Sequence, residues 1–447
     1  MIAPNTRNPL LAFNIIWIGE LISLIGSGLS NFALAVWTYQ NSGSITLFTL
    51  IALAGMLPAV LLSPIAGSVV DRWDRRMILI LSNIGLAVIM GVLAILIFTH
   101  LLALWCIYLA VILGSVLSTF VRPAFSSSIT VLVPEEQFGQ ANGRMQLANA
   151  ISQFIAPVLA GVLLVTIQLQ GVVLLDFVSF LFAIGTLALV AIPKPAKKSS
   201  EGEAEEESFW KEVANGWRYI VKDAGLLALV IFAALFNFLG AIPSVLIQPL
   251  ILNFSSAAGL GLVMTLGGTG MLVGSLALSL WRGPKKRINL LFVGLAVCGL
   301  CLVVAGLQPS LVLVTIGAFF FFFSLPAINT TIATVLQQKV APDFQGRVFA
   351  LSSMFGVSLT PLAYVLAGLL SDRVFEPLLQ PHGLLAPSVG QIVGVGAGRG
   401  IGLLFILVGL LLIMLTFGGY LYPRLRHIED EPSEGPAQVQ LQELTEA

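Results

Sequence analysis

Long apolar segments recur along the chain at fairly regular intervals, and shorter polar segments separate them. The apolar segments lie near residues 10–39, 45–70, 77–98, 102–121, 143–167, 171–193, 225–250, 257–281, 288–307, 310–334, 348–371 and 400–422. A helix needs roughly 20 apolar residues to cross the hydrocarbon core of a bilayer, and each segment approaches or exceeds that length. A membrane β-barrel would instead show segments of about 10 residues that alternate in polarity. The pattern therefore predicts an all-α polytopic membrane protein with twelve transmembrane helices.

The composition agrees with a chain embedded in a lipid bilayer. Of the 447 residues, 57% are hydrophobic and only 10% are charged, whereas a soluble domain carries about 25% charged residues. The formal net charge is zero, which gives no reason to expect a nucleic-acid partner. Cys106, Cys298 and Cys301 lie in apolar runs and are interpreted as small buried hydrophobic residues. No metal site and no cofactor are expected.

The distribution of positive charge predicts the orientation of the chain. All but two of the 22 Lys and Arg residues fall at the N-terminus, in even-numbered connections between spans, or in the C-terminal tail. The two exceptions are Arg373 and Arg399. The positive-inside rule then places both termini in the cytoplasm of a bacterial cell. The first apolar run lacks a signal-peptide cleavage site, so it is expected to be the first span in the cytoplasmic membrane.

Polar stretches divide the chain into two halves. Residues 1–193 are predicted to form an N-terminal six-helix bundle, and residues 223–422 a C-terminal one. Residues 194–222 between them are expected to be a cytoplasmic linker, charged at its start. At its end, Phe209 to Val221 mix aromatic and charged residues and predict an amphipathic helix on the inner leaflet. Residues 423–447 are expected to be a disordered cytoplasmic tail.

Two segments of the chain resemble each other. Each has a Gly-Arg pair, then a span with a central proline and a later Ala-Gly. The residues concerned are Gly143, Arg144 and Pro157 in the first half, and Gly346, Arg347 and Pro361 in the second. Each segment includes the fifth span of its half. The pattern predicts a duplicated six-span unit, as in transporters whose halves rock about a central site.

The connection between the second and third spans carries a recognisable motif. Residues 67–76 read G-S-V-V-D-R-W-D-R-R. This motif resembles the loop signature of the major facilitator superfamily, in which such residues latch the outward-open state. The resemblance implies a latch formed by Gly67, Asp71, Arg72, Arg75 and Arg76, in which Asp71 forms charge-assisted hydrogen bonds that break and re-form. The alternative is a loop that only anchors the chain through its positive charge.

A second motif lies in the fifth span. Ala156-Pro157 followed by Ala160-Gly161 resembles the antiporter motif of that superfamily, with Ala156 where glycine is usual. This resemblance implies export rather than uptake. The segments at 17–27, 132–137 and 344–351 resemble the macrolide-efflux and siderophore-export permeases. They imply the fold of these permeases but not a particular substrate. The chain is expected to act as a monomer and to export small amphipathic molecules in exchange for protons. No clustered catalytic groups are visible, so the chain is not expected to be an enzyme.

Ionisable side chains within spans are costly and mark functional sites. Glu20 lies inside the first span, and helical spacing puts Ser23, Ser27, Ser30 and Asn31 on its face. This polar stripe is expected to face a water-filled cavity. A carboxyl group there can exchange a proton in each cycle or attract a cationic drug. The alternative is a protonated side chain that only bonds a neighbouring helix.

Asp176 in the sixth span is the second candidate for proton coupling. Weaker candidates for the cavity lining are Asn237, Gln248, Asn329, Ser115, Ser118 and Thr119. Many drug/proton antiporters of the superfamily carry an arginine in the middle of span four. Here the first charge is Arg122, near the cytoplasmic end of that span, so the details of proton coupling are expected to differ.

Two alternatives to drug efflux remain open. The same fold serves a dedicated exporter of a siderophore or another self-made natural product, and only the range of substrates distinguishes the two. A membrane sensor or scaffold that transports nothing is the alternative from another class, favoured only by the acidic linker and tail. The glycines at 394–400 match neither the G-x-G-x-x-G nor the G-x-x-x-x-G-K-[ST] spacing of nucleotide-binding loops. They are interpreted as a flexible entry to the last span.

Overall fold

The computed structural model describes residues 9–134, 138–190, 217–280, 286–340 and 342–430. Within these ranges the chain forms helices and no β-strand. Eleven helices are long and apolar enough to cross a membrane, and a bent pair of helices brings the number of candidate spans to 12. The prediction of an all-α polytopic protein with about twelve spans is therefore confirmed.

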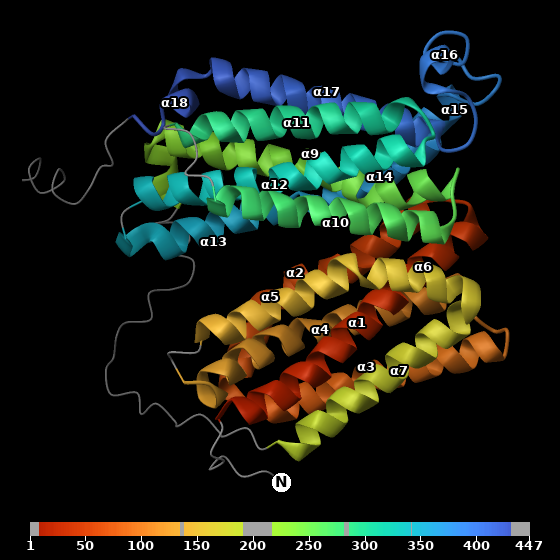
Figure 1. Ribbon diagram of the computed structural model, residues 1–447, viewed down its shortest axis with the longest axis vertical. Helices are drawn as coiled ribbons and strands as arrows, with labels where there is room; N and C mark the ends of the chain where they lie inside the picture. Colours follow the sequence, from red (N-terminus) through yellow and green to blue (C-terminus); the bar gives the residue numbers. More distant parts are fainter. Residues whose placement is uncertain (1–8, 135–137, 191–216, 281–285, 341, 431–447) are drawn as a thin grey trace, which may run out of the picture. The chain divides into compact units, whose positions relative to one another are not determined.

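The contacts between Cα atoms divide the chain into two compact units, residues 1–199 with 255–265 and residues 200–254 with 266–447. The first unit holds α1 (Pro9–Ser42), α2 (Ile45–Arg72), α3 (Arg75–Phe98), α4 (Leu104–Leu132), α5 (Phe138–Phe154), α6 (Ala156–Thr166) and α7 (Gln168–Leu189) (Figure 1). The second holds α9 (Ala224–Leu252), most of α10 (Ala257–Leu280), α11 (Arg287–Leu307), α12 (Leu311–Lys339), α13 (Pro342–Ser358), α14 (Thr360–Leu370), the π-helix η2 (Ser371–Phe375), α15 (Glu376–Leu378), α16 (Gly390–Val393), α17 (Arg399–Leu421) and α18 (Pro423–Arg426). The bundle, linker and tail boundaries stay predictions, and residues 194–216 and 431–447 lie outside the described ranges.

In the first unit, α1 packs along α7, which also lies against α3 (Figure 1). Two glycines of α1 permit this close approach. A Cβ atom at Gly19 would collide with the side chain of Thr186, and one at Gly26 would lie 2.7 Å from Oδ1 of Asp176. Small residues at helix contacts are the usual means of bringing membrane helices together. The glycines therefore place polar groups of α7 directly against α1.

In the second unit, α11 packs against both α12 and α17. Two pairs of glycines bring the backbones of α11 and α17 into contact. A Cβ atom at Gly299 would lie 2.7 Å from the carbonyl oxygen of Gly409, and one at Gly402 would lie 2.8 Å from that of Gly306. The glycines within each helix are seven residues apart, which places them on one face. This contact leaves no space for even a methyl group.

Replacing Gly409 with alanine is expected to destabilise the protein by about 1–3 kcal/mol, because the new methyl group overpacks a backbone contact. A Cβ atom at Gly418 of the same helix would have nothing within 4 Å. Gly418→Ala is therefore the matched control, and alanine there is expected to be neutral or favourable for the helix. Heating each variant in detergent with a thiol-reactive dye reports exposure of the buried Cys106 and Cys298. Equal unfolding temperatures for both variants would contradict the prediction.

Two predicted spans are each built from two helices. The axis bends by 41° between α5 and α6, and a single residue separates α13 from α14. Pro157 is the second residue of α6, and Pro361 is the second residue of α14. Proline lacks a backbone N–H and fits the first turn of a helix, so each proline marks the start of a new segment. The two spans resemble each other in structure as they do in sequence.

Helices α4 and α5 extend beyond the fourth span predicted to end at 121 and the fifth predicted to begin at 143. Helix α4 continues to Leu132 and α5 begins at Phe138, so Arg122 and Arg144 lie in helices rather than in a connection. The apolar pattern stops at 121 because the next turns of α4 carry serines and arginine. Helix geometry continues regardless, with Pro123 inside the helix, because the backbone hydrogen bonds do not depend on side-chain polarity.

The glycine-rich segment before α17 is a defined turn rather than the flexible entry that was expected. Glu376 accepts hydrogen bonds from the backbone N–H groups of Gly398 (3.2 Å) and Ile401 (3.4 Å). Gly398 has a φ of +79°, which glycine adopts without strain. Arg399 is buried, and its Nη2 donates to the carbonyl oxygens of Gly306 (2.7 Å) and Leu307 (3.2 Å). A carboxylate thus caps the start of α17, and a guanidinium caps the end of α11.

Part of the predicted amphipathic helix at 209–221 falls on described residues. Residues 217–222 are helical, and residues 209–216 lie outside the described ranges. The ring centroids of Trp217 and Phe355 are 5.1 Å apart, and Tyr219 Oη is 3.4 Å from the carbonyl oxygen of Lys339. Ile220 is fully buried. The described turns therefore pack against α12 and α13, and not only against lipid.

Candidate functional site

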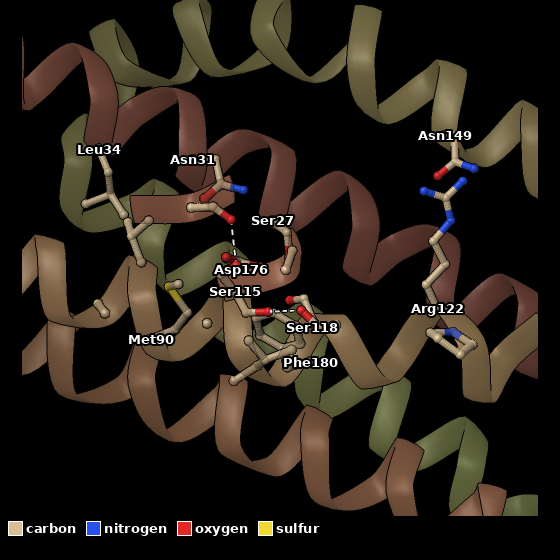
Figure 2. Close-up of a pocket in the computed structure, with 18 of the residues that line it drawn as sticks. Ser27, Asn31, Leu34, Met90, Ser115, Ser118, Arg122, Asn149, Asp176 and Phe180 are labelled. Atoms are coloured by element: carbon tan, nitrogen blue, oxygen red, sulfur yellow. Dashed lines mark hydrogen bonds between the residues drawn. The ribbon is translucent and has the colours of Figure 1, made fainter. Parts of the chain in front are cut away.

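A hollow of about 890 Å³ opens within the first unit (Figure 2). Its lining includes Ser27, Asn31, Ser63, Met90, Ser115, Ser118, Thr119, Arg122, Ser126, Asn149, Asp176 and Phe180. These residues come from α1, α2, α3, α4, α5 and α7. A second hollow of about 350 Å³ shares Ser27, Asn31, Arg122 and Asn149 with the first and extends to Glu20. Hydroxyl, amide and charged groups thus line a continuous region inside an otherwise apolar bundle.

Asp176 is fully buried on α7 and forms part of the hollow's wall. Its Oδ1 accepts a hydrogen bond of 3.2 Å from Ser179 Oγ, one turn along the same helix. The hydroxyls of Ser27 and Ser30 on α1 also lie beside this carboxylate. Within the described residues its Oδ2 has no hydrogen-bond partner. The absence of a side chain at Gly26 is what lets α1 bring its serines this close.

Glu20 is buried on α1, with 6% of its surface exposed. Its neighbour is the amide of Asn83 on α3, and Asn83 Nδ2 donates to the carbonyl oxygen of Leu79 in its own helix (2.9 Å). Glu20 Oε1 has no hydrogen-bond partner among the described residues. Ser23 lines the smaller hollow with Glu20. The structure therefore places the predicted polar stripe of α1 along the two hollows.

Helix α4 contributes a second polar stripe. Ser115, Ser118, Thr119, Arg122 and Ser126 are spaced by three or four residues or are adjacent, and all line the larger hollow. Ser115 Oγ donates to the carbonyl oxygen of Gly55 on α2 (2.5 Å), and Thr119 Oγ1 donates to that of Ser115 (2.7 Å). Arg122 was predicted to lie near the cytoplasmic end of the span and was not among the predicted cavity residues. The signal that could have found it is its helical spacing from Ser115, Ser118 and Thr119.

Three predicted cavity residues do not line either hollow, because they belong to the second unit. Asn237 on α9 is exposed and donates to the carbonyl oxygen of Ala233 in its own helix (2.8 Å). Gln248, also on α9, is half-buried, and its Oε1 has no partner among the described residues. Asn329 on α12 is exposed. The structure gives these three residues no shared site.

The two described arginines of the predicted latch bond within their own unit. Arg75 Nη1 donates to the carbonyl oxygen of Ser127 on α4 (2.8 Å). Arg76 donates to the carbonyl oxygens of Leu187 and Ala188 at the end of α7, both at 3.0 Å. These bonds tie the start of α3 to two neighbouring helices. The surroundings of Gly67 and the side chains of Asp71 and Arg72 are not among those described, so the latch stays a prediction.

Arg144 of the repeated Gly-Arg motif and Ala156 of the antiporter motif lie at contacts with α1. Arg144 on α5 donates to Asn14 Oδ1, and Trp17 Nε1 donates to the carbonyl oxygen of Arg144 (3.1 Å). Ala156 is fully buried at the start of α6. A Cβ atom added at Gly28 of α1 would lie 2.7 Å from the Cβ atom of Ala156. The other buried small residues of that motif are Ala160 and Gly161. The side chains of Gly143, Gly346 and Arg347 lie outside those described.

Comparisons with known proteins give one consistent result. Residues 16–364 match the model of the Major Facilitator Superfamily. Macrolide efflux protein A of Streptococcus pyogenes is 28% identical over 374 residues, which cover 81% of this chain and 90% of that protein. The multidrug efflux pump Tap of Mycolicibacterium fortuitum is 23% identical over 376 residues, which cover 82% of this chain and 90% of the pump.

Solved structures give the same fold. A bacterial homologue of the human lysosomal transporter Spinster, in an inward-facing and unoccupied conformation, matches with a TM-score of 0.71 at 14% identity. The match covers 95% of this chain and 99% of the homologue. The nucleoside transporter NupG matches with a TM-score of 0.65 at 13% identity, over 92% of this chain and 99% of NupG.

Proposed function

This chain belongs to the Major Facilitator Superfamily of membrane transporters, and we propose that it exports small amphipathic molecules, macrolides among them, by proton antiport with alternating access. The observation that carries the proposal is the polar hollow with a buried carboxylate inside an apolar helical bundle. Ionisable groups at such positions mark substrate and proton pathways. The efflux activity named for two relatives over most of their length supports the direction of transport.

The two buried carboxylates have different surroundings, which suggests different roles. Three serine hydroxyls surround Asp176, and such donors stabilise an ionised carboxylate. Glu20 has a single amide neighbour, and each carboxyl group has one oxygen without a hydrogen-bond partner among the described residues. We propose that Glu20 takes up and releases the transported proton, and that Asp176 keeps its charge and attracts a basic group of the substrate. An ionic bond to substrate at one carboxylate then leaves the other free for the proton.

We further propose the cellular setting. The excess of Lys and Arg at the termini and in the even-numbered connections supports a bacterial cytoplasmic membrane with both termini inside. The two bundles of a single chain are sufficient for alternating access, so the transporter is proposed to act as a monomer. The proton gradient supplies the energy, and no cofactor is required.

Transport in energised inside-out vesicles tests the proposal. Vesicles that contain the protein are expected to accumulate radiolabelled erythromycin several-fold above vesicles without it, because export from the cell is uptake here. A protonophore is expected to remove this difference, because it collapses the gradient that antiport requires. Adding erythromycin to acidified vesicles should also release protons. Accumulation that resists the protonophore would contradict proton antiport. Equal accumulation with and without the protein would contradict macrolide export.

A further inference from the structure

Arg122 is an exposed cation on the wall of both hollows. Within the described residues its guanidinium forms no hydrogen bond and no ion pair. Figure 2 shows the side chain pointing toward Asn149, and the two residues lie at one end of the larger hollow. Asp176 lies apart from them, beside Ser27 and Asn31. The hollow therefore has a guanidinium at one end and a carboxyl group at the other.

Neither of the two carboxylates that line the hollows is paired with Arg122. Glu20 lines the smaller hollow with Arg122, but its neighbour is Asn83. Asp176 is surrounded by serines of α1 and α7. An arginine that only snorkels toward the membrane surface needs no polar helix face beneath it. Arg122 instead continues the hydroxyl stripe of Ser115, Ser118 and Thr119, all of which line the hollow.

We propose that Arg122, with Asn149 beside it, binds an acidic group of the exported molecule. A guanidinium presents a planar fork of donors that matches a carboxylate or another oxyanion, and the Asn149 amide adds further donors. Since Asp176 lies at the other end of the same hollow, the preferred substrates carry an acidic group and a basic group at separate positions. This inference rests on the proposed export function and adds zwitterionic amphipaths, as preferred substrates, to the basic macrolides.

Rhodamine B and its ethyl ester form a matched pair of probes, because they differ only in whether the carboxylate is free. Export of each dye is measured in cells, and binding of each to the purified protein is measured by fluorescence anisotropy. The wild type is expected to bind the free acid more tightly than the ester. Arg122→Gln is expected to weaken binding of the acid relative to the ester by about tenfold, as for a lost charge-assisted hydrogen bond. Arg122→Lys, which keeps the charge, is expected to retain part of the preference.

Arg373→Gln makes the same charge change at an exposed position outside both hollows and serves as the control. An unchanged preference in Arg122→Gln, or equal loss of both dyes, would overturn the role of Arg122. A wild type that binds neither dye, or binds both equally, would overturn it as well. Selective binding of the acid without export of either dye would leave the recognition site standing and count against the export function.

Discussion

Glu20→Gln is expected to abolish protonophore-sensitive export of macrolides and to reduce accumulation in energised vesicles to the level without protein. The amide has nearly the same shape as the carboxyl group but cannot exchange a proton. Because glutamine fits the same buried position on the wall of the hollow, we expect the variant to fold and to bind drug. It should still equilibrate drug across the membrane in both directions. A purely structural role of Glu20 would not separate equilibration from gradient-driven transport.

Two further variants sharpen this test. Ser23→Ala changes a buried neighbour on the same helix face, and its proton coupling is expected to persist. Asp176→Asn is expected to weaken transport of basic drugs while a neutral substrate stays protonophore-sensitive. If Asp176→Asn loses coupling for every substrate and Glu20→Gln keeps it, the proposed roles of the two carboxylates are reversed. If both variants keep coupling, neither carboxylate is the proton carrier.

Arg399→Leu is expected to destabilise the second unit by about 3 kcal/mol or more, the largest stability effect expected for this chain. Arg399 is 5% exposed, and its guanidinium donates to the carbonyl oxygens of Gly306 and Leu307 at the end of α11. Leucine would leave both acceptors buried without a donor, and bonds from a charged donor are worth about 1.5–3 kcal/mol each. Glu376, which interacts electrostatically with Arg399, would also lose its opposite charge.

Arg373 provides the control for Arg399. It is the other arginine in the odd-numbered connections, but its side chain is exposed on η2. Arg373→Leu removes the same charge and is expected to change stability by less than about 0.5 kcal/mol. Unfolding temperatures are compared with the thiol-reactive dye, which reports on Cys298 of α11. If the two leucine variants unfold together, the capping of α11 by Arg399 contributes little. Arg399→Lys, with one point charge, is expected to fall between them.

The sequence by itself determined the membrane class, the number of spans and the family. The membrane class and the number of spans follow from the composition of whole segments, and the family follows from short motifs. A helix in lipid must be apolar over about 20 residues, so each span is visible in the chain. The motifs at 67–76 and around Pro157 are local in sequence. The polar stripe from Glu20 to Asn31 was also predictable, because one helix sets its spacing.

The tertiary structure alone decided which polar groups meet. Gly26 and Ser27 sit against Asp176 because α1 packs on α7, a contact between residues about 150 positions apart. Arg122 was interpreted as a topology signal and lies in a hollow, and Arg399 was counted with the connections and is buried against α11. Hydropathy reports the average environment of a segment, not the partner of one side chain. That partner depends on which helix faces which, and only the packed bundle specifies it.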